Sequence, residues 1–152
     1  MIPWPQHLVI LPILIPLVAG AGLLFIADRQ RLAKAMVSLG ATIALAAVSL
    51  LLVGLAGEEG FEGVYLLGNW AAPFGIVLVL DRLSALMVAL TSILAVPVLV
   101  FSLARWHSAG AHFHSLYQFL LMGLNGAFLT ADLFNLFVFF EVMLAASYGL
   151  LL

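Results

Sequence analysis

The stretch that decides the fold is Leu133-Phe-Asn-Leu-Phe-Val-Phe-Phe-Glu141-Val-Met-Leu-Ala-Ala-Ser-Tyr-Gly-Leu-Leu-Leu152. Its length and composition predict a membrane-spanning helix, because about 20 apolar residues cross a hydrocarbon core of ~30 Å. Glu141 lies alone in the middle of this run. A charged carboxylate at that depth costs about 2.5–3.5 kcal/mol on insertion scales, so such residues are paired, hydrated or protonated. Glu141 is therefore the leading candidate for a proton acceptor and donor. The alternative is a carboxyl that only hydrogen-bonds a neighbouring helix.

The composition extends the membrane prediction to the whole chain. Of its 152 residues, 66% are hydrophobic and 8% are charged, so a water-soluble globule could not cover its surface with polar groups. The net charge of −2, without a basic tract, argues against nucleic-acid binding. The sequence has no cysteine, which excludes thiol chemistry and disulfides. Nothing in it predicts a cofactor or a metal centre.

The hydrophobic pattern predicts an all-α, polytopic transmembrane helix bundle that forms one domain, or part of one, over residues 1–152. The apolar runs are long enough for five spans. The first is interpreted as a retained helix, because no Lys or Arg precedes it as in a signal peptide. Asp132 is expected to cap the fifth span and so to make a tight turn after the fourth. The spans are about 8–27, 35–55, 83–103, 113–131 and 133–152.

The loops predict an orientation and one small hairpin. Short loops with Lys and Arg face the cytoplasm, and here these are 28–34 and 105–107, so the N-terminus is expected outside and Leu152 inside. The loop between the second and third spans is acidic and longer. Residues 63–70 and 76–80 are rich in Val, Ile, Leu, Tyr and Trp, and the Ala-Ala-Pro-Phe-Gly segment at 71–75 supplies a turn. We expect a short extracytoplasmic hairpin that caps the helices or meets a neighbour.

The predicted helical face of Glu141 is apolar. At 100° per residue it is shared by six residues, whereas Asp132 lies on the opposite side, so these two acids are not a dyad. No buried Lys or Arg is predicted in the first four spans, so any basic partner has to come from elsewhere. The six residues are Phe134, Phe137, Val138, Leu144, Ala145 and Tyr148.

Five further residues are accessory candidates. Asp81 and Arg82 precede a helix, where a carboxylate that interacts with the helix dipole is the competing interpretation. His112 and His114 could share a proton, but their spacing without a third ligand is more typical of interfacial histidines than of a metal site. Asp132 is a possible accessory acid in addition to its predicted role as a cap.

Two segments resemble a known family. Phe113-His-Ser-Leu-Tyr-Gln-Phe-Leu-Leu-Met-Gly-Leu-Asn-Gly-Ala-Phe-Leu-Thr-Ala-Asp132, continued through Phe-Phe-Glu141-Val to Leu151, closely resembles the D subunit of Mrp-type multisubunit Na+/H+ antiporters. Asp81-Arg-Leu-Ser-Ala-Leu-Met87 looks like the start of that family's third helix. The family is similar to the proton-pumping, antiporter-like subunits of respiratory complex I. The resemblance implies that Glu141 matches the family's helix-five glutamate, which works with a lysine on the seventh helix.

The resemblance also implies what kind of protein this is. Family members have about fourteen helices built around inverted repeats, so the chain is expected to be the N-terminal part of a longer subunit and to lack the partner lysine. Its parent would exchange Na+ for protons in a bacterial cytoplasmic membrane, in contact with lipid and with other subunits, as a secondary transporter and not an enzyme. A proton-translocating subunit of a complex-I-like or hydrogenase-linked enzyme is the alternative. A non-transporting assembly protein is the alternative from another class.

Overall fold

The computed structural model describes residues 4–58, 61, 63–70, 75–105, 110 and 112–152. It confirms the all-helical class, with five α-helices and one small hairpin among these residues. The turn predicted at 71–75 lies, apart from Gly75, outside the described residues, as do Trp106 and His107 of the predicted basic loop. The elements in chain order are the 3-10 helix η1 (Trp4–Ile10), α1 (Leu11–Phe25), α2 (Arg31–Ala56), β1 (Val64–Leu66), the 3-10 helix η2 (Leu67–Asn69), β2 (Val77–Val79), α3 (Arg82–Arg105), α4 (Phe113–Leu129) and α5 (Leu133–Leu151).

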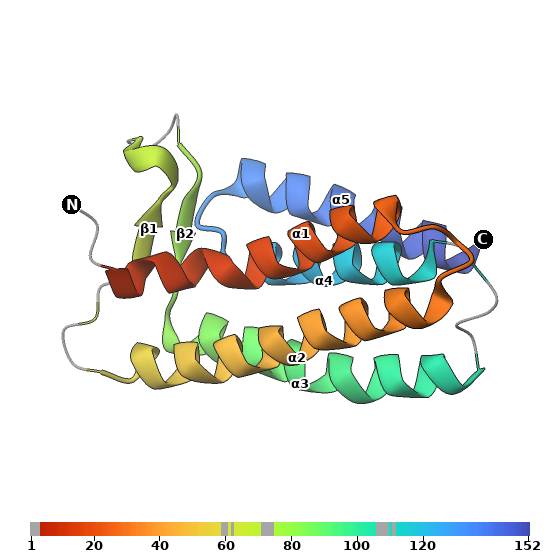
Figure 1. The fold of residues 1–152 in the computed structure, drawn as a ribbon. Coiled ribbons are helices and arrows are strands. Elements are labelled where there is room, and N and C mark those ends of the chain that lie inside the picture. The colour runs from red at the N-terminus through yellow and green to blue at the C-terminus, as the bar shows by residue number, and fades with distance from the viewer. Residues whose placement is uncertain (1–3, 59–60, 62, 71–74, 106–109, 111) are drawn as a thin grey trace.

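The α-helices lie side by side and define two ends of the bundle (Figure 1). The hairpin end holds β1, β2 and the turn between α4 and α5. The loop end holds the connection between α1 and α2, and Leu152. The hairpin and the turn between α4 and α5, which were predicted to share one side of the membrane, therefore lie at one end of the bundle. Which end faces the cytoplasm stays a prediction.

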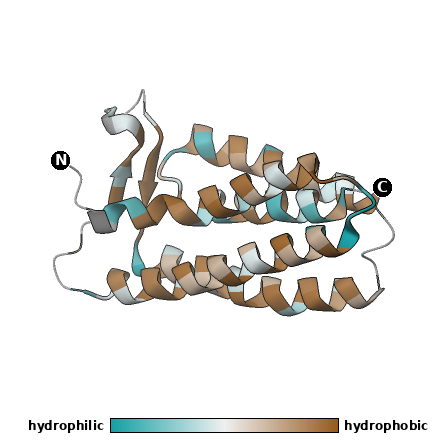
Figure 2. Ribbon diagram, viewed as in Figure 1, coloured by the Kyte–Doolittle hydropathy of each residue, from teal (hydrophilic) through white to brown (hydrophobic). Residues whose placement is uncertain are grey.

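Within the part of the chain that the structure describes, four helical segments are long and apolar enough to cross a membrane, judged by length and composition. They are Gln6–Phe25, Arg31–Ala56, Arg82–Ala104 and Leu133–Leu151. Figure 2 shows the apolar residues that dominate the helices. The fourth predicted span corresponds to α4, which has 17 residues and packs against α1, α2, α3 and α5. Its central place explains why so many of its polar side chains are buried.

The hairpin forms as predicted and packs against the ends of the helices. β1 and β2 are antiparallel, with Val64 opposite Val79. Leu78 of β2 also pairs with Thr130, and Ala131 N donates a hydrogen bond to Val77 O at 3.0 Å. The strands therefore attach to the turn between α4 and α5. This attachment places the start of α5 relative to the rest of the bundle.

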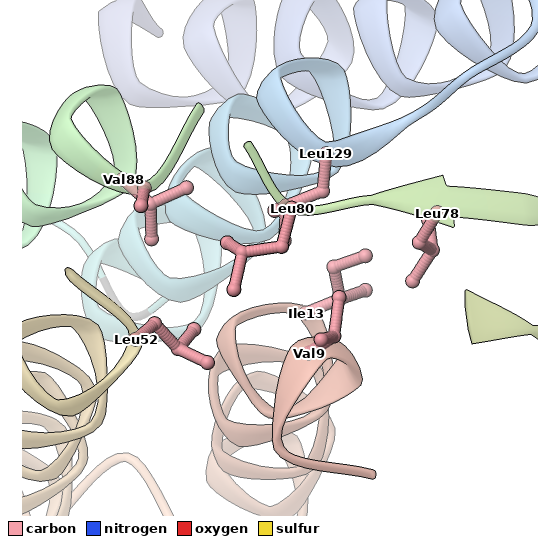
Figure 3. Close-up of a cluster of buried hydrophobic side chains, with 8 residues drawn as sticks. Val9, Ile13, Leu52, Leu78, Leu80, Val88 and Leu129 are labelled. Carbon is pink, nitrogen blue, oxygen red and sulfur yellow. The ribbon is translucent and has the colours of Figure 1, made fainter. Parts of the chain in front are cut away.

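A cluster of buried apolar side chains lies where the hairpin meets the helices (Figure 3). Leu78 and Leu80 extend from the hairpin segment toward side chains of α1, α2, α3 and α4, and Leu78 is fully buried. The hairpin thus caps the helices at this end, as the sequence suggested. Burying each of these leucine side chains contributes about 1.5–3 kcal/mol to the stability of the fold. The cluster contains Val9, Ile13, Leu52, Leu78, Leu80, Ala85, Val88 and Leu129.

Two aspartates cap the helices that they precede. Asp132 Oδ1 accepts a hydrogen bond from Asn135 N at 2.7 Å, which confirms the predicted N-cap of α5. Asp81 Oδ1 accepts from Ser84 N at 2.6 Å, and Asp81 N donates to Ser84 Oγ at 2.8 Å, a reciprocal cap of α3. The bond from Asn135 N holds the pKa of Asp132 below its ordinary value, and that from Ser84 N does the same for the pKa of Asp81.

Replacing Asp132 by alanine is expected to lower the stability of the fold by about 1 kcal/mol, because the first turn of α5 loses its acceptor. Asparagine should restore most of this, since its oxygen can accept the same bond. Because the folded-state pKa of Asp132 is lowered, its charge stabilises the fold above the unfolded-state pKa, and this stability is lost as the pH falls through the folded-state pKa. Thermal unfolding in detergent at neutral and acidic pH measures both effects. An alanine variant as stable as wild type would contradict the cap.

Candidate functional site

Glu141 lies on a face of α5 that points away from the other described helices. Its side chain is exposed, and the apolar face predicted around it is exposed in large part, with Phe137 and Tyr148 at 60% and 63% exposure. Among the described residues, no hydrogen bond or ion pair to the Glu141 carboxylate is found. The site therefore consists of one acid on an apolar helix face. In a membrane such a carboxylate needs a cation, water or a proton.

Two glycines of α4 fix the depth of Glu141. A Cβ on Gly123 would lie 2.9 Å from Met143 N and 3.0 Å from Phe139 O, so the two backbones are in contact. Gly126 faces the ring of Phe139 even more closely, since an added Cβ would overlap the ring. Since Glu141 lies between Phe139 and Met143, it is level with these glycines, on the far side of α5. Gly123 and Ala127 lie four residues apart, a spacing of small residues that is typical of ordinary close helix packing.

Replacing Gly123 by alanine is expected to destabilise the packing of α4 on α5 by about 1–3 kcal/mol, the usual cost of overpacking. The clash is with backbone atoms of α5, so a side-chain rotation cannot relieve it. Thermal unfolding in detergent is the measurement. Gly22 is the matched control, because it is an exposed helical glycine and an added Cβ would have nothing within 4 Å. If both alanine variants unfold at the wild-type temperature, the contact is not tight.

The structure does not gather the accessory candidates around Glu141. Asp132 is the N-cap of the same helix, nine residues away, which corresponds to a rise of ~13.5 Å. Asp81 and Arg82 lie at the start of α3, where Asp81 acts as a cap and Arg82 is exposed.

The two histidines differ from each other. His112 is exposed and precedes α4, whereas His114 is 4% exposed inside the bundle. In the described part of the chain, no group of three or more His, Cys, Asp or Glu side chains could hold a metal ion.

Lys34 corrects one prediction. No buried Lys or Arg was expected in the first four spans, but α2 begins at Arg31, before the predicted start, and Lys34 is only 4% exposed. Its Nζ donates to Asp28 Oδ1 at 2.6 Å. The hydrogen bond and charge of Lys34 hold the pKa of Asp28 below its ordinary value. The ion pair allows this lysine to be buried near the loop end. The rule that places Lys and Arg in cytoplasmic loops had assigned it to the hydrated loop instead.

Buried polar side chains on α2 and α4 face one another, and they were not predicted from the sequence. Gln118 Nε2 donates to Ser38 O at 3.0 Å, to Ser38 Oγ at 3.1 Å and to Thr42 Oγ1 at 3.0 Å. Lys34, Ser38 and Thr42 recur every four residues, and His114 and Gln118 do the same, which is one face of a helix in each case. This four-residue spacing of polar residues is the feature of the sequence from which a polar helix face could have been predicted.

Asn125 replaces a backbone hydrogen bond that a proline removes. Pro16 lies inside α1 and has no N–H, so it cannot donate to the carbonyl of Pro12, four residues before it. Asn125 Nδ2 donates to Pro12 O at 3.0 Å instead, and Asn125 is fully buried. A side chain of α4 thereby satisfies a backbone acceptor of α1 that would otherwise be unpaired in an apolar interior.

Comparison with known proteins shows the family. A Rhizobium meliloti (strain 1021) protein, named as the probable D subunit of a K(+)/H(+) antiporter, is 60% identical over the whole chain, which covers 29% of that protein. The D subunit of the Na(+)/H(+) antiporter of Alkalihalophilus pseudofirmus is 48% identical over 96% of the chain and 30% of its own length. The chain is homologous to these antiporter D subunits. It spans about three tenths of the length of these relatives. No family model matches it.

Solved structures agree with this homology. The Mrp complex from Dietzia sp. DQ12-45-1b contains a chain that matches with a TM-score of 0.81 and 34% identity, over 94% of this chain and 27% of that one. A chain of the archaeal membrane-bound sulfane sulfur reductase matches with the same TM-score but 21% identity, over 95% of this chain and 30% of that one, which shows a shared fold only. The Mrp resemblance predicted from the sequence is confirmed. The chain is a multi-pass, predominantly helical homologue of a membrane subunit.

Proposed function

We propose that this chain contributes a mid-membrane proton site, Glu141, to a subunit of a bacterial cation/proton antiporter. The homology to D subunits of K+/H+ and Na+/H+ antiporters supports the transporter class. The observation that carries the proton site is the placement of Glu141. Its acid group is level with the glycine contacts of α4, on an exposed apolar face of α5. A helix face of this kind suits contact with further parts of a larger subunit or complex.

The chemistry of the proposed site is reversible protonation. A neutral carboxylic acid is tolerated in an apolar environment, whereas a carboxylate there requires a cation or water. When a basic group approaches Glu141, the acid releases its proton and forms an ion pair. When the basic group withdraws, the acid takes up a proton. Alternation between these states moves one proton, and its coupling to cation movement would be made by the complete complex.

The transported cation is tested by proton flux in everted vesicles that contain the complete complex, with either Na+ or K+ added. The 60% identity to a protein named for K+/H+ antiport makes K+ a candidate beside the Na+ that the sequence resemblance implied. We expect cation-dependent proton release in cells that carry the full-length gene and none when it is deleted. Flux that is unchanged by the deletion would overturn the transport role.

The redox-driven alternative has one supporting observation, the fold shared with a chain of the sulfane sulfur reductase. It predicts that the native subunit copurifies with an iron–sulfur module and that proton flux requires an electron donor. Copurification with antiporter subunits alone, with cation-driven flux, would exclude it. The higher identity to the Mrp complex, 34% against 21%, favours the antiporter.

A further inference from the structure

A column of polar side chains runs through the bundle between α2 and α4. It starts at the loop end, where the exposed Asp28 pairs with the buried Lys34. His112 also lies close enough for its charge to lower the pKa of Asp28. From there the column continues inward to Gln118, which bonds to α2, and along α4 to Asn125, which bonds to Pro12 of α1. We call it the α2–α4 column, and it consists of Asp28, Lys34, Ser38, Thr42, His114, Gln118 and Asn125.

Two acceptors in this column are unpaired. Gln118 Oε1 and Asn125 Oδ1 are buried, and among the described residues neither accepts a hydrogen bond. Exchanging the oxygen and nitrogen positions of either amide would not satisfy these acceptors. Gln118 Nε2 faces Ser38 O, and Asn125 Nδ2 faces Pro12 O. A backbone carbonyl can only accept, so the nitrogen of each amide has to be on that side.

A buried acceptor without a donor is costly, and it is more costly in a membrane, where lipid offers no donor. Water is the donor that reaches such sites, and it binds where other polar groups surround it. The polar groups described beside the Gln118 amide are the hydroxyls of Ser38 and Thr42, at 3.1 Å and 3.0 Å from its nitrogen Nε2.

We infer that Gln118 Oε1 and Asn125 Oδ1 each bind an internal water, and that the α2–α4 column is a hydrated proton inlet from the loop end of the bundle. The inference rests on the proposed function only for the identity of the cargo. From His114 to Asn125 the column extends ~17 Å along α4. Asn125 lies between Gly123 and Gly126, so the column ends at the depth of Glu141.

A layer of leucines separates the two water sites. Leu45 follows Thr42 on α2, and Leu121 follows Gln118 on α4; the two are fully or almost fully buried and pack in one cluster. An apolar layer in a polar path interrupts continuous hydration and so prevents a free leak of protons. Leu45 and Leu121 are also side chains near Gln118 that can be labelled in an experiment.

Hydroxyl-radical footprinting by X-ray pulses tests the water, using the complete complex in membranes. Radicals formed from bound water label adjacent side chains, so Leu121 and Leu45 should be labelled in wild type although both are shielded from bulk solvent. In Gln118→Leu this labelling should fall several-fold. Ser92→Ala is the matched control, because Ser92 is fully buried and its hydroxyl donates to Val88 O of its own helix. Unlabelled leucines in wild type would overturn the inference, even if the Gln118 variant failed to assemble.

Proton flux tests the inlet. Gln118→Leu should reduce cation-coupled proton flux several-fold with the complex intact, whereas Ser92→Ala should leave it unchanged. Loss of labelling with normal flux would show that the water is structural and would overturn the inlet. A failure of the proposed function would be seen in a different experiment, as normal proton flux in a Glu141→Gln variant. The hydroxyl-radical labelling of Leu45 and Leu121 would not change in that case.

Discussion

Replacing Glu141 by glutamine in the full-length subunit is expected to abolish cation-coupled proton flux while the complex still assembles. Glutamine has nearly the same shape and cannot release a proton. A positioned proton-transfer group typically contributes 10²–10⁴-fold, so we expect a fall of at least about 10²-fold. Assembly should survive, because no described residue is bonded to the Glu141 carboxylate. Flux in everted vesicles, normalised to the amount of assembled complex, is the measurement.

Two further variants make this prediction specific. Glu141→Asp keeps an acid one methylene shorter, so partial flux is expected from a misplaced but functional group. Tyr148→Phe alters a polar atom on the same exposed face, seven residues further along α5, and should retain wild-type flux. Normal flux in Glu141→Gln, or equal losses in all three variants, would mean that the face serves packing and that Glu141 carries no proton.

The fold was largely predictable from the sequence, because its strongest signals are local. Apolar runs located all five helices, and Asp132 was identified as a cap from its position before the fifth span. The hairpin followed from β-branched and aromatic residues on both sides of a turn. The start of α2 was misjudged for a non-local reason. The helix begins at Arg31, and Lys34 is buried in it while the exposed Asp28, six residues earlier, pairs with its Nζ.

The candidate site was predictable only in part. The face that Glu141 shares with Phe134, Phe137 and Tyr148 follows from helical periodicity, and those side chains are exposed together in the structure. The polar interior did not follow, because Gln118 and Asn125 look unremarkable in the sequence of an amphipathic segment. Their roles depend on which helix faces α4, and that depends on packing over the whole bundle.

The bond between Asn125 and α1 gives a second large expected effect. Asn125→Leu should destabilise the fold by about 1–3 kcal/mol, because the Pro12 carbonyl is left buried without a donor. Pro16→Ala supplies the missing N–H from within α1, so the carbonyl no longer depends on α4. In the Pro16→Ala background, Asn125→Leu should therefore cost much less. A double-mutant cycle measures this dependence directly.

The cycle compares the unfolding temperatures of four detergent-solubilised proteins. These are the wild type, Pro16→Ala, Asn125→Leu and the double variant. The small cavity created by Pro16→Ala is common to two of the four proteins and cancels in the coupling. A matched second cycle pairs Pro16→Ala with Gln118→Leu, which contacts α2 and should show no coupling to α1. Equal losses for Asn125→Leu with and without Pro16 would show that Asn125 stabilises the bundle through its own burial, and that the proline is not the reason an amide is found there.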